Sequence, residues 1–577
     1  YPPSLVSLGL CYERGWGVEQ NKSRAVKLYL KAGQQGSATG YCNAGYCYLT
    51  GIGVQVDREM AVSLLKKAAK KGLPRALDLL GDCYERGVGV TCDGKKAVEY
   101  YQKAAEQDYP PALVSLGLCY EQGTGICKDE AMALDYYRKA GELGDPAGAC
   151  NAGYCYLNGI GSPVDEAEAV RWLQKAADQD YPRALDLLGD CLFHARGTEQ
   201  DDKKAVELYR RAAEQDYPPA LVSLGLCYEH GRGVPEDEAK ALVYYEEAGN
   251  RESGVGACNA GYCYLTGIGT PVDEKRAVEW LQRAARLNNP RAMTLLGDCY
   301  QQGQGLPVDE KEAVGLYHRA AELGYIPAMV ELGICFERGR GIAQDPQTAL
   351  YYYRKAGELG SAAGACNTGY LLLHGIGTPR REREAVEWLQ KAADQGSARA
   401  INVLGDCYLE ARGVDRDDHR AAELYQKAAE LGYGPALVNL GLCYQSGRGV
   451  PADEARAFFY YQDAAKQGEV SGYCHAGYCC LHGIGTPVNE ERAVEWLQKA
   501  ADQGDFWALG VLGDCYLHGK GVRQDQRRAK ELYQTAAQGG DAHHIAGIFN
   551  GESDDFGVVV GPGHAAGLPH YGLRQVS

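Results

Sequence analysis

Cysteine is the residue of this sequence with the greatest potential for chemistry. The chain contains 22 cysteines, and fourteen of them recur at one position of a 36-residue repeat, from Cys11 to Cys515. Thiols in such a pattern could form disulfides, bind a metal ion or act as nucleophiles. Leu371 stands at the one exception. A position that accepts cysteine or leucine indicates buried packing, because free cysteine commonly behaves as a small hydrophobic residue.

The spacing of the cysteines argues against disulfides and metal sites. We expect equivalent residues of neighbouring repeats about 8–10 Å apart, whereas a disulfide needs Cα atoms closer than about 7 Å. Cys150 and Cys155 are five residues apart, so they point in different directions around a helix. No Cys-x-x-Cys occurs, and no histidine pair at zinc spacing joins a cysteine. The sequence therefore predicts free thiols, no metal and a cytoplasmic or other reducing compartment.

No other residues form a catalytic constellation. The twelve histidines are scattered, and their one cluster, His543-His544, falls where the repeat pattern degrades. The Gly-x-Gly that recurs in most repeats, as at Gly159-Ile-Gly161, separates two helical segments and does not follow a strand, so it is not typical of a phosphate-binding loop. Catalysis needs one preorganised site, whereas this chain offers repeated and interchangeable positions. We therefore predict no enzymatic activity and no cofactor.

Two amphipathic segments, here called helix A and helix B, make up each repeat. Helix A is expected to begin at Pro110-Pro111, where missing N–H groups cost little, and to end at Gly123-Thr-Gly125, whose glycines can adopt positive φ angles. Helix B is expected to begin at Asp129-Glu130, whose charges favour a helix N-terminus, and to stop near Gly144. Small residues mark the expected crossing of the two helices: Ala112, Gly117, Ala133 and Ala140.

The motif Ala-x-x-x-Leu-Gly-x-x-Tyr-x-x-Gly-x-Gly, followed by Asp, Lys-Ala and Lys-Ala-Ala, resembles Sel1-like repeats. Residues 81–90, with Lys96-Ala97 and Lys103-Ala104-Ala105, are a close match. The resemblance covers residues 1 to about 540, where the glycine of Leu-Gly, here called the key glycine, recurs every 36 residues from Gly9 to Gly513. It implies an all-α fold, a right-handed α/α superhelical solenoid akin to tetratricopeptide repeats. It also implies an adaptor role, and it does not imply an activity.

The fifteen repeats are of three kinds that recur in fixed order as five blocks of 108 residues. The first kind carries Val-x-Leu-Gly-Leu-Cys-Tyr, as at residues 114–120. The second carries Cys-Asn-Ala-Gly-Tyr-Cys-Tyr, as at residues 150–156, and the third carries Leu-Gly-Asp-Cys, as at residues 188–191. This order indicates duplication of a three-repeat unit, which would repeat any inner surface five times.

If the family's geometry holds, a concave groove is lined by the helix A residues three before and one after the key glycine, which share one helical face. The first kind places apolar residues there: Val114 and Leu118, Val222 and Leu226, Val438 and Leu442. The second kind places cysteine and tyrosine: Cys150 and Tyr154, Cys258 and Tyr262, Cys366 and Tyr370. The third kind places acids: Asp78 and Asp82, Asp186 and Asp190, then the single Asp298, Asp406 and Asp514.

These patches suit an extended peptide or helix that carries apolar anchors and Lys or Arg. The alternative is that valine, leucine and cysteine are core, tyrosine is half-buried packing and aspartate is solvated surface. The net charge of −16 disfavours nucleic acid. No stretch approaches 18 consecutive apolar residues, so we expect no membrane insertion. The expected partners are therefore proteins or peptides.

The ends of the array differ from its middle. Residues 1–9 are in phase with residues 109–117 and carry no polar capping unit, so we expect the natural protein to extend upstream. Residues 1–540 are predicted to form the solenoid and residues 541–550 a degenerate terminal cap helix. The glycine-rich residues 551–577 are predicted to be irregular, unless residues 556–560 dock as an extended segment.

The sequence thus predicts a non-enzymatic scaffold or adaptor that holds a multiprotein complex together through its groove. Two alternatives stay open. One is a structural protein that self-associates end to end through its uncapped ends or its tail. The other is a secreted or ER-lumenal Sel1-like adaptor, in which the cysteines would be paired.

Overall fold

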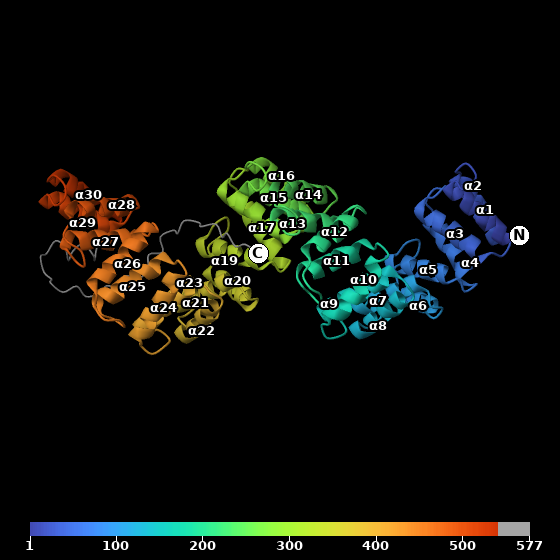
Figure 1. Cartoon of the computed structure of the whole chain (residues 1–577), viewed down its shortest axis with the longest axis horizontal. Helices are drawn as coiled ribbons and strands as arrows, with labels where there is room; N and C mark the ends of the chain where they lie inside the picture. The colour runs from blue at the N-terminus through green and yellow to red at the C-terminus, as the bar shows by residue number, and fades with distance from the viewer. Residues whose placement is uncertain (540–577) are drawn as a thin grey trace. The chain divides into compact units, whose positions relative to one another are not determined.

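The structure, a computed structural model, describes residues 1–539. In this range the chain forms thirty α-helices and no β-strand, which confirms the predicted all-α class. Each repeat contributes one helix A and one helix B, which alternate along the chain (Figure 1). The predicted cap helix at 541–550 and the tail at 551–577 lie outside the described residues.

The helices A carry odd numbers and the helices B carry even numbers. The helices A are α1 (Pro2–Arg14), α3 (Ala38–Thr50), α5 (Pro74–Arg86), α7 (Pro110–Gln122), α9 (Pro146–Asn158), α11 (Pro182–Phe193), α13 (Pro218–Glu229), α15 (Gly254–Thr266), α17 (Pro290–Gln302), α19 (Ile326–Arg338), α21 (Ala362–His374), α23 (Ala398–Glu410), α25 (Gly434–Ser446), α27 (Val470–His482) and α29 (Phe506–His518). The helices B are α2 (Lys22–Gln34), α4 (Arg58–Ala69), α6 (Gly94–Ala105), α8 (Glu130–Glu142), α10 (Glu166–Ala177), α12 (Asp202–Ala213), α14 (Glu238–Asn250), α16 (Glu274–Arg286), α18 (Glu310–Glu322), α20 (Pro346–Glu358), α22 (Glu382–Asp394), α24 (Asp418–Glu430), α26 (Glu454–Lys466), α28 (Glu490–Asp502) and α30 (Gln526–Gly539).

The described chain falls into two compact units. The first is Tyr1–Leu323, with α1–α18, and the second begins at Gly324 and holds α19–α30. Within each unit every helix packs on the helices that precede and follow it in the chain. Repeats therefore stack in sequence order, as α-helical solenoids do.

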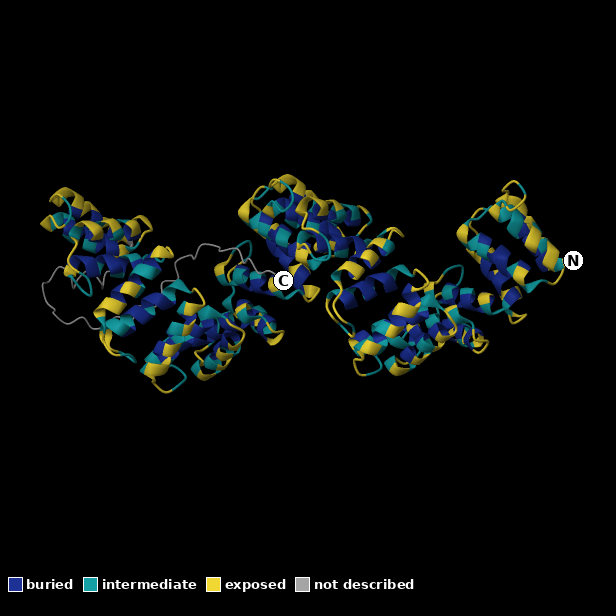
Figure 2. Cartoon of the chain, viewed as in Figure 1, coloured by how far each residue is buried: buried dark blue, intermediate teal, exposed yellow. Residues whose placement is uncertain are grey.

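The core lies between the helices of each unit, where their buried faces meet (Figure 2). At the crossing of α7 and α8, a Cβ atom on Gly117 would lie 2.5 Å from Cε1 of Tyr137. Tyr137 is completely buried, as are Ala112, Ala133 and Ala140. Gly117 is therefore required because the ring of Tyr137 packs directly on its backbone, as the small residues at the crossing predicted. In repeats of the second kind a helix B leucine takes this place, as Leu173 does at Gly153.

The ends of the helices follow the local sequence. Gly123 has a φ angle of 75° and closes α7 by donating its N–H to the carbonyl of Cys119, and Gly125 has a φ angle of 71°. The Asp129 carboxylate then accepts a hydrogen bond of 3.0 Å from the N–H of Met132. This contact satisfies a free donor in the first turn of α8. Both predicted boundaries are confirmed.

Helix α22 lacks the cap that the other described helices B have. Its N-cap residue is Arg381, whose side chain makes no capping hydrogen bond, whereas the Asp417 carboxylate at the start of α24 accepts one of 2.9 Å from the N–H of Arg420. We expect Arg381→Asp to stabilise the chain by about 1 kcal/mol, and Asp417→Ala to destabilise it by about the same amount. Chemical denaturation followed by circular dichroism checks both values. An Arg381→Asp protein no more stable than the parent would contradict this account of the cap.

Candidate functional site

The candidate site is the surface of the helices A that carries the positions three before and one after each key glycine, here called the helix A face. Helices A of neighbouring repeats contact one another, as α7 does α9 and α9 does α11. Residues four apart on a helix lie on the same side. The face therefore brings residues from consecutive repeats next to one another within each unit.

The apolar positions of the first kind divide into buried and exposed residues. Val222 and Val438 are buried, and Val114 is half-buried. By contrast, the side chains of Leu118 and Leu226 are 38% and 39% exposed. The valines thus belong to the core, as the alternative interpretation states, while the two leucines remain accessible.

The second kind combines a buried thiol with a half-buried ring. Cys150, Cys258 and Cys366 are buried, and burial raises the pKa of Cys150 to about 12. Tyr154, Tyr262 and Tyr370 are half-buried. The cysteines therefore line the core and present no reactive thiolate, whereas each tyrosine keeps part of its ring at the surface.

An arginine of the following repeat covers each of these tyrosines, which the sequence analysis did not foresee. The Arg183 guanidinium lies 5.0 Å from the ring centre of Tyr154 and donates a hydrogen bond of 2.7 Å to Oδ1 of Asn151. The same Arg–Tyr–Asn unit occurs in four blocks: Arg75, Tyr46 and Asn43; Arg183, Tyr154 and Asn151; Arg291, Tyr262 and Asn259; Arg399, Tyr370 and Asn367. The 108-residue recurrence of arginine and asparagine was the available signal.

The first aspartate of the third kind is almost entirely covered. Asp78 and Asp186 are 8% and 7% exposed, and Ser223 on the next helix A donates a hydrogen bond of 3.2 Å to Asp186. The pKa of Asp186 is raised to about 7, mainly by burial and secondly by the negative charge of Asp190. The pKa of Asp78 is likewise raised to about 7, mainly by burial and secondly by the negative charge of Asp82. Neither carboxyl presents much surface to a ligand.

The second aspartate of the third kind is half-buried and accepts a hydrogen bond from a helix B tyrosine of its own repeat. The hydroxyl donors and their acceptors are Tyr101 and Asp82 (2.8 Å), Tyr209 and Asp190 (2.8 Å), Tyr317 and Asp298 (2.7 Å), Tyr425 and Asp406 (2.7 Å), and Tyr533 and Asp514 (2.5 Å). Burial raises the pKa of Asp298 to about 6 and that of Asp406 to about 7. These acids therefore join helix A to helix B as well as facing the surface.

The 22 cysteines are all free in the structure. Thirteen of the fourteen at the repeated position are buried, and Cys11 is half-buried. Burial raises the pKa of Cys47 and of Cys119 to about 12. The cysteines at the repeated position therefore serve in packing, as the leucine at residue 371 predicted.

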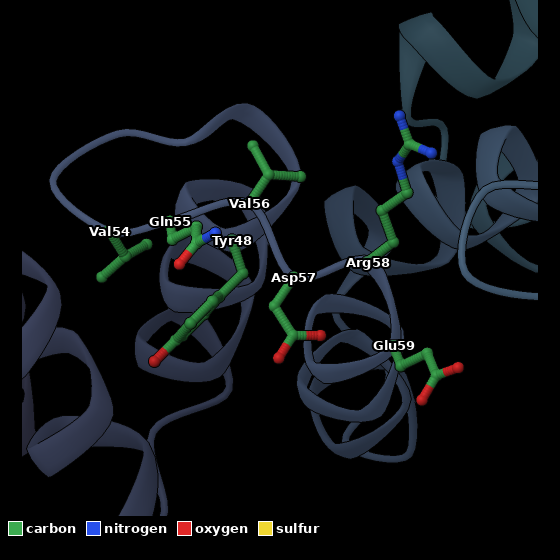
Figure 3. Close-up of a pocket in the computed structure, with 7 residues that line it drawn as sticks. All are labelled: Tyr48, Val54, Gln55, Val56, Asp57, Arg58 and Glu59. Atoms are coloured by element: carbon green, nitrogen blue, oxygen red, sulfur yellow. The ribbon is translucent and has the colours of Figure 1, made fainter.

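The described chain carries open surface depressions at its A–B loops. Residues 1–539 contain no group of three His, Cys, Asp or Glu side chains that could hold a metal ion. A surface depression of about 740 Å³ lies at an A–B loop, lined by Tyr48 and residues 54–59 (Figure 3). Its Asp57 carboxylate caps α4 through the N–H of Met60, and Arg58 points away from Tyr48. Among the described helices, none has the length and apolar character needed to span a bilayer.

Comparison with known families identifies the repeat. A family model described as Sel1 repeat matches fifteen times, at residues 2–37, 38–73, 74–109, 110–145, 146–181, 182–217, 218–253, 255–289, 290–325, 326–361, 362–397, 398–433, 434–469, 470–505 and 508–541. The chain belongs to the Sel1-repeat family. Proteins built from Sel1 repeats are in general non-enzymatic scaffolds for protein–protein interactions.

Solved structures of Sel1-repeat proteins are among the matches. A protective antigen of uropathogenic Escherichia coli, c5321, is 28% identical, with 86% of this chain and 98% of that chain covered and a TM-score of 0.47. A Sel1 repeat protein from Oxalobacter formigenes is also 28% identical, with 56% and 92% covered and a TM-score of 0.41. The cysteine rich protein B of Helicobacter pylori is 26% identical, with 22% and 92% covered and a TM-score of 0.20. No curated protein matches the chain.

Proposed function

We propose that this Sel1-repeat chain is a scaffold that binds an extended segment of a partner protein along its helix A face. The observation that carries the proposal is the exposure of Leu118 and Leu226, at equivalent positions of two blocks of the first unit. Apolar side chains that stay exposed among buried neighbours are suitable anchors for a peptide. Equivalent anchors in successive blocks would act together, because binding at one raises the effective concentration at the next.

Polar contacts complement these anchors. Within the second block, Leu118 is followed on the helix A face by the ring of Tyr154 and then by Asp190. A lysine or arginine of the partner suits the half-buried Asp190 carboxylate, because the chain carries a net charge of −16. Asp82, Asp298, Asp406 and Asp514 offer the equivalent contact in the other blocks.

The apolar part of the proposal is tested by paired substitutions on the two helix types. We expect Leu118→Glu with Leu226→Glu to weaken capture of a partner from lysate about tenfold or more, since one central apolar anchor commonly contributes more than about 1 kcal/mol. Val243→Glu is the matched control, because Val243 is 57% exposed on a helix B, α14. Quantitative mass spectrometry of the captured proteins measures the difference. Equal loss from both variants, or no loss from either, would contradict binding at this face.

The acidic part is tested with Asp82→Asn and Asp190→Asn. Each is the less buried aspartate of its pair on the helix A face, so neutralising it should weaken binding of a basic partner, and raising the salt concentration should weaken that binding further. Asp78→Asn and Asp186→Asn serve as the comparison, since both carboxyls are covered. Weakening by the covered pair alone would indicate an indirect effect through folding and would reject the acidic contact.

A further inference from the structure

The fifth block departs from the Arg–Tyr–Asn unit of the other four. At the position of Arg75, Arg183, Arg291 and Arg399 it carries Trp507, and at the position of the asparagine it carries His475. The tyrosine, Tyr478, is retained on α27, and Trp507 lies in the first turn of α29. One block has therefore lost the cation that the chain itself supplies everywhere else.

Trp507, His475 and the retained Tyr478 form an aromatic cluster. The Trp507 ring centre lies 5.5 Å from that of Tyr478 and 6.1 Å from that of His475. His475 in turn stacks on Tyr461 at 4.9 Å. Trp507 is 37% exposed and its neighbour Phe506 is 38% exposed. Two adjacent aromatic side chains thus keep an open face at the start of α29.

A carboxylate, Asp505, has been gained beside this cluster. Asp505 stands where the other blocks have Leu73, Tyr181, Asn289 and Ser397, so a carboxylate is gained as the arginine is lost. It caps α29 through the N–H of Ala508, at 2.7 Å, and acts electrostatically on His475. Burial lowers the pKa of His475 to about 4, so this ring carries no charge at neutral pH. Lys499 and Arg492 lie over other rings, those of Tyr473 and Trp496.

We propose that Trp507, Phe506 and Asp505 form a docking site for an arginine side chain of the partner protein. The guanidinium would lie on the open face of Trp507 and pair with the Asp505 carboxylate. Tryptophan is the aromatic side chain that binds cations most strongly, and arginine is the cation most often found on it. The first four blocks show this chemistry within the chain, because each places a guanidinium on this surface. The inference rests on the proposed function and names one anchor of the partner.

A fluorine label on tryptophan tests the site directly. The full chain is labelled with 5-fluorotryptophan, and the Trp507 resonance is assigned with a Trp507→Phe variant. The probe is a blocked Leu-Arg-Leu tripeptide, with the same tripeptide carrying citrulline as the uncharged control. We expect the arginine peptide to shift the Trp507 resonance in a saturable manner, and citrulline to weaken binding about fivefold. The resonances of Trp172, Trp280 and Trp388 should not move.

Two variants separate the site from general effects. Trp507→Arg restores the residue of the other four blocks and should abolish binding of the tripeptide. Binding to this variant is measured from the chemical shifts of the peptide. Asp505→Ser copies the Ser397 cap of α23 and should weaken binding about threefold while leaving the helix capped. Circular dichroism confirms that both variants are folded. No shift of Trp507, equal binding of the citrulline peptide, or full binding by Trp507→Arg would overturn the site.

Failure of the arginine site can be distinguished from failure of the proposed function. It reports one anchor, whereas capture of a partner by the leucine variants reports the helix A face as a whole. If Trp507 does not respond but capture still depends on Leu118 and Leu226, only the arginine site is rejected. If neither dependence is found, the proposed function is rejected as well.

Discussion

Gly125→Ala is expected to destabilise the chain by roughly 3 kcal/mol, whereas Gly123→Ala is expected to destabilise it by only about 1 kcal/mol. Both glycines have nearly the same backbone conformation, with φ angles of 71° and 75°. They differ in what a side chain would meet. A Cβ on Gly125 would overlap the carbonyl group of Gly94 and lie 2.7 Å from the N–H nitrogen of Lys95, whereas a Cβ on Gly123 would lie 3.4 Å from Cβ of Lys128.

The sequence of the other repeats supports this difference. Alanine occupies the first glycine position at Ala195 and Ala411, each with a positive φ angle. The second position is glycine in all fifteen repeats. In thirteen repeats, at the positions from Gly53 to Gly305 and from Gly377 to Gly521, the second glycine lies against the backbone at the start of the preceding helix B. An alanine there must displace a neighbouring backbone, which is the costly case of overpacking.

Guanidinium denaturation of the two single variants measures the difference, and hydrogen exchange locates it. Exchange should accelerate in α5–α8, because the contact joins α6 to the loop between α7 and α8, and repeats interact mainly with their neighbours. Equal destabilisation by the two alanines would show that the positive φ angle alone sets the requirement for glycine.

The contribution of Asp186 to the stability of the chain is expected to fall as the pH rises from about 4 to about 7, by about 1.4 kcal/mol per pH unit. Burial raises the pKa of Asp186 from 3.8 to about 7, so the folded state holds this proton more tightly than the unfolded state. The stabilisation is complete below pH 3.8 and is lost as the pH passes through 7. Asp78 contributes in the same direction.

Asp186→Asn isolates one of these groups. Asparagine resembles the protonated acid, and the chain already carries Asn402 at the equivalent position of α23, buried and accepting a hydrogen bond of 3.0 Å from Asn439. The variant should be more stable than the parent by roughly 2 kcal/mol at pH 8 and should depend less on pH. Asp135→Asn, at an exposed position of α8, is the control. Chemical denaturation of the parent and the variants between pH 4 and pH 8 measures the difference. If the stability of the Asp186→Asn protein fell as steeply with pH as that of the parent, Asp186 would not be the source of the pH dependence.

Residue spacing was sufficient to predict the elements of the fold. The 36-residue period predicted the stacking of repeats, and the turn glycines and Asp129 predicted the bounds of α7 and α8 to within two residues. Local signals of this kind depend on the few residues that form each cap or crossing. These signals can therefore be recognised in a single repeat, and their recurrence in fifteen repeats strengthens the prediction.

The surface was harder to predict, because it depends on contacts between repeats. Helical spacing placed Leu118 and Val222 on the same helix A face, yet Leu118 is exposed and Val222 is buried. The same spacing could not show that Ser223 covers Asp186, or that Arg183 lies on Tyr154. These partners are more than 25 residues apart, and their side-chain directions are fixed only when consecutive helices A pack together.

The central claim, that partners bind on the helix A face, is tested most directly by photo-crosslinking. A photoreactive phenylalanine analogue is placed at Leu118 or Leu226 on helices A, or at Val243 or Val164 away from that face. All four native side chains are exposed. The account predicts that the same partner protein crosslinks at the two leucine positions, and that its crosslinked peptide differs between them as an extended segment requires. Crosslinks that are equally strong at Val243 and Val164, or that occur only there, would contradict it.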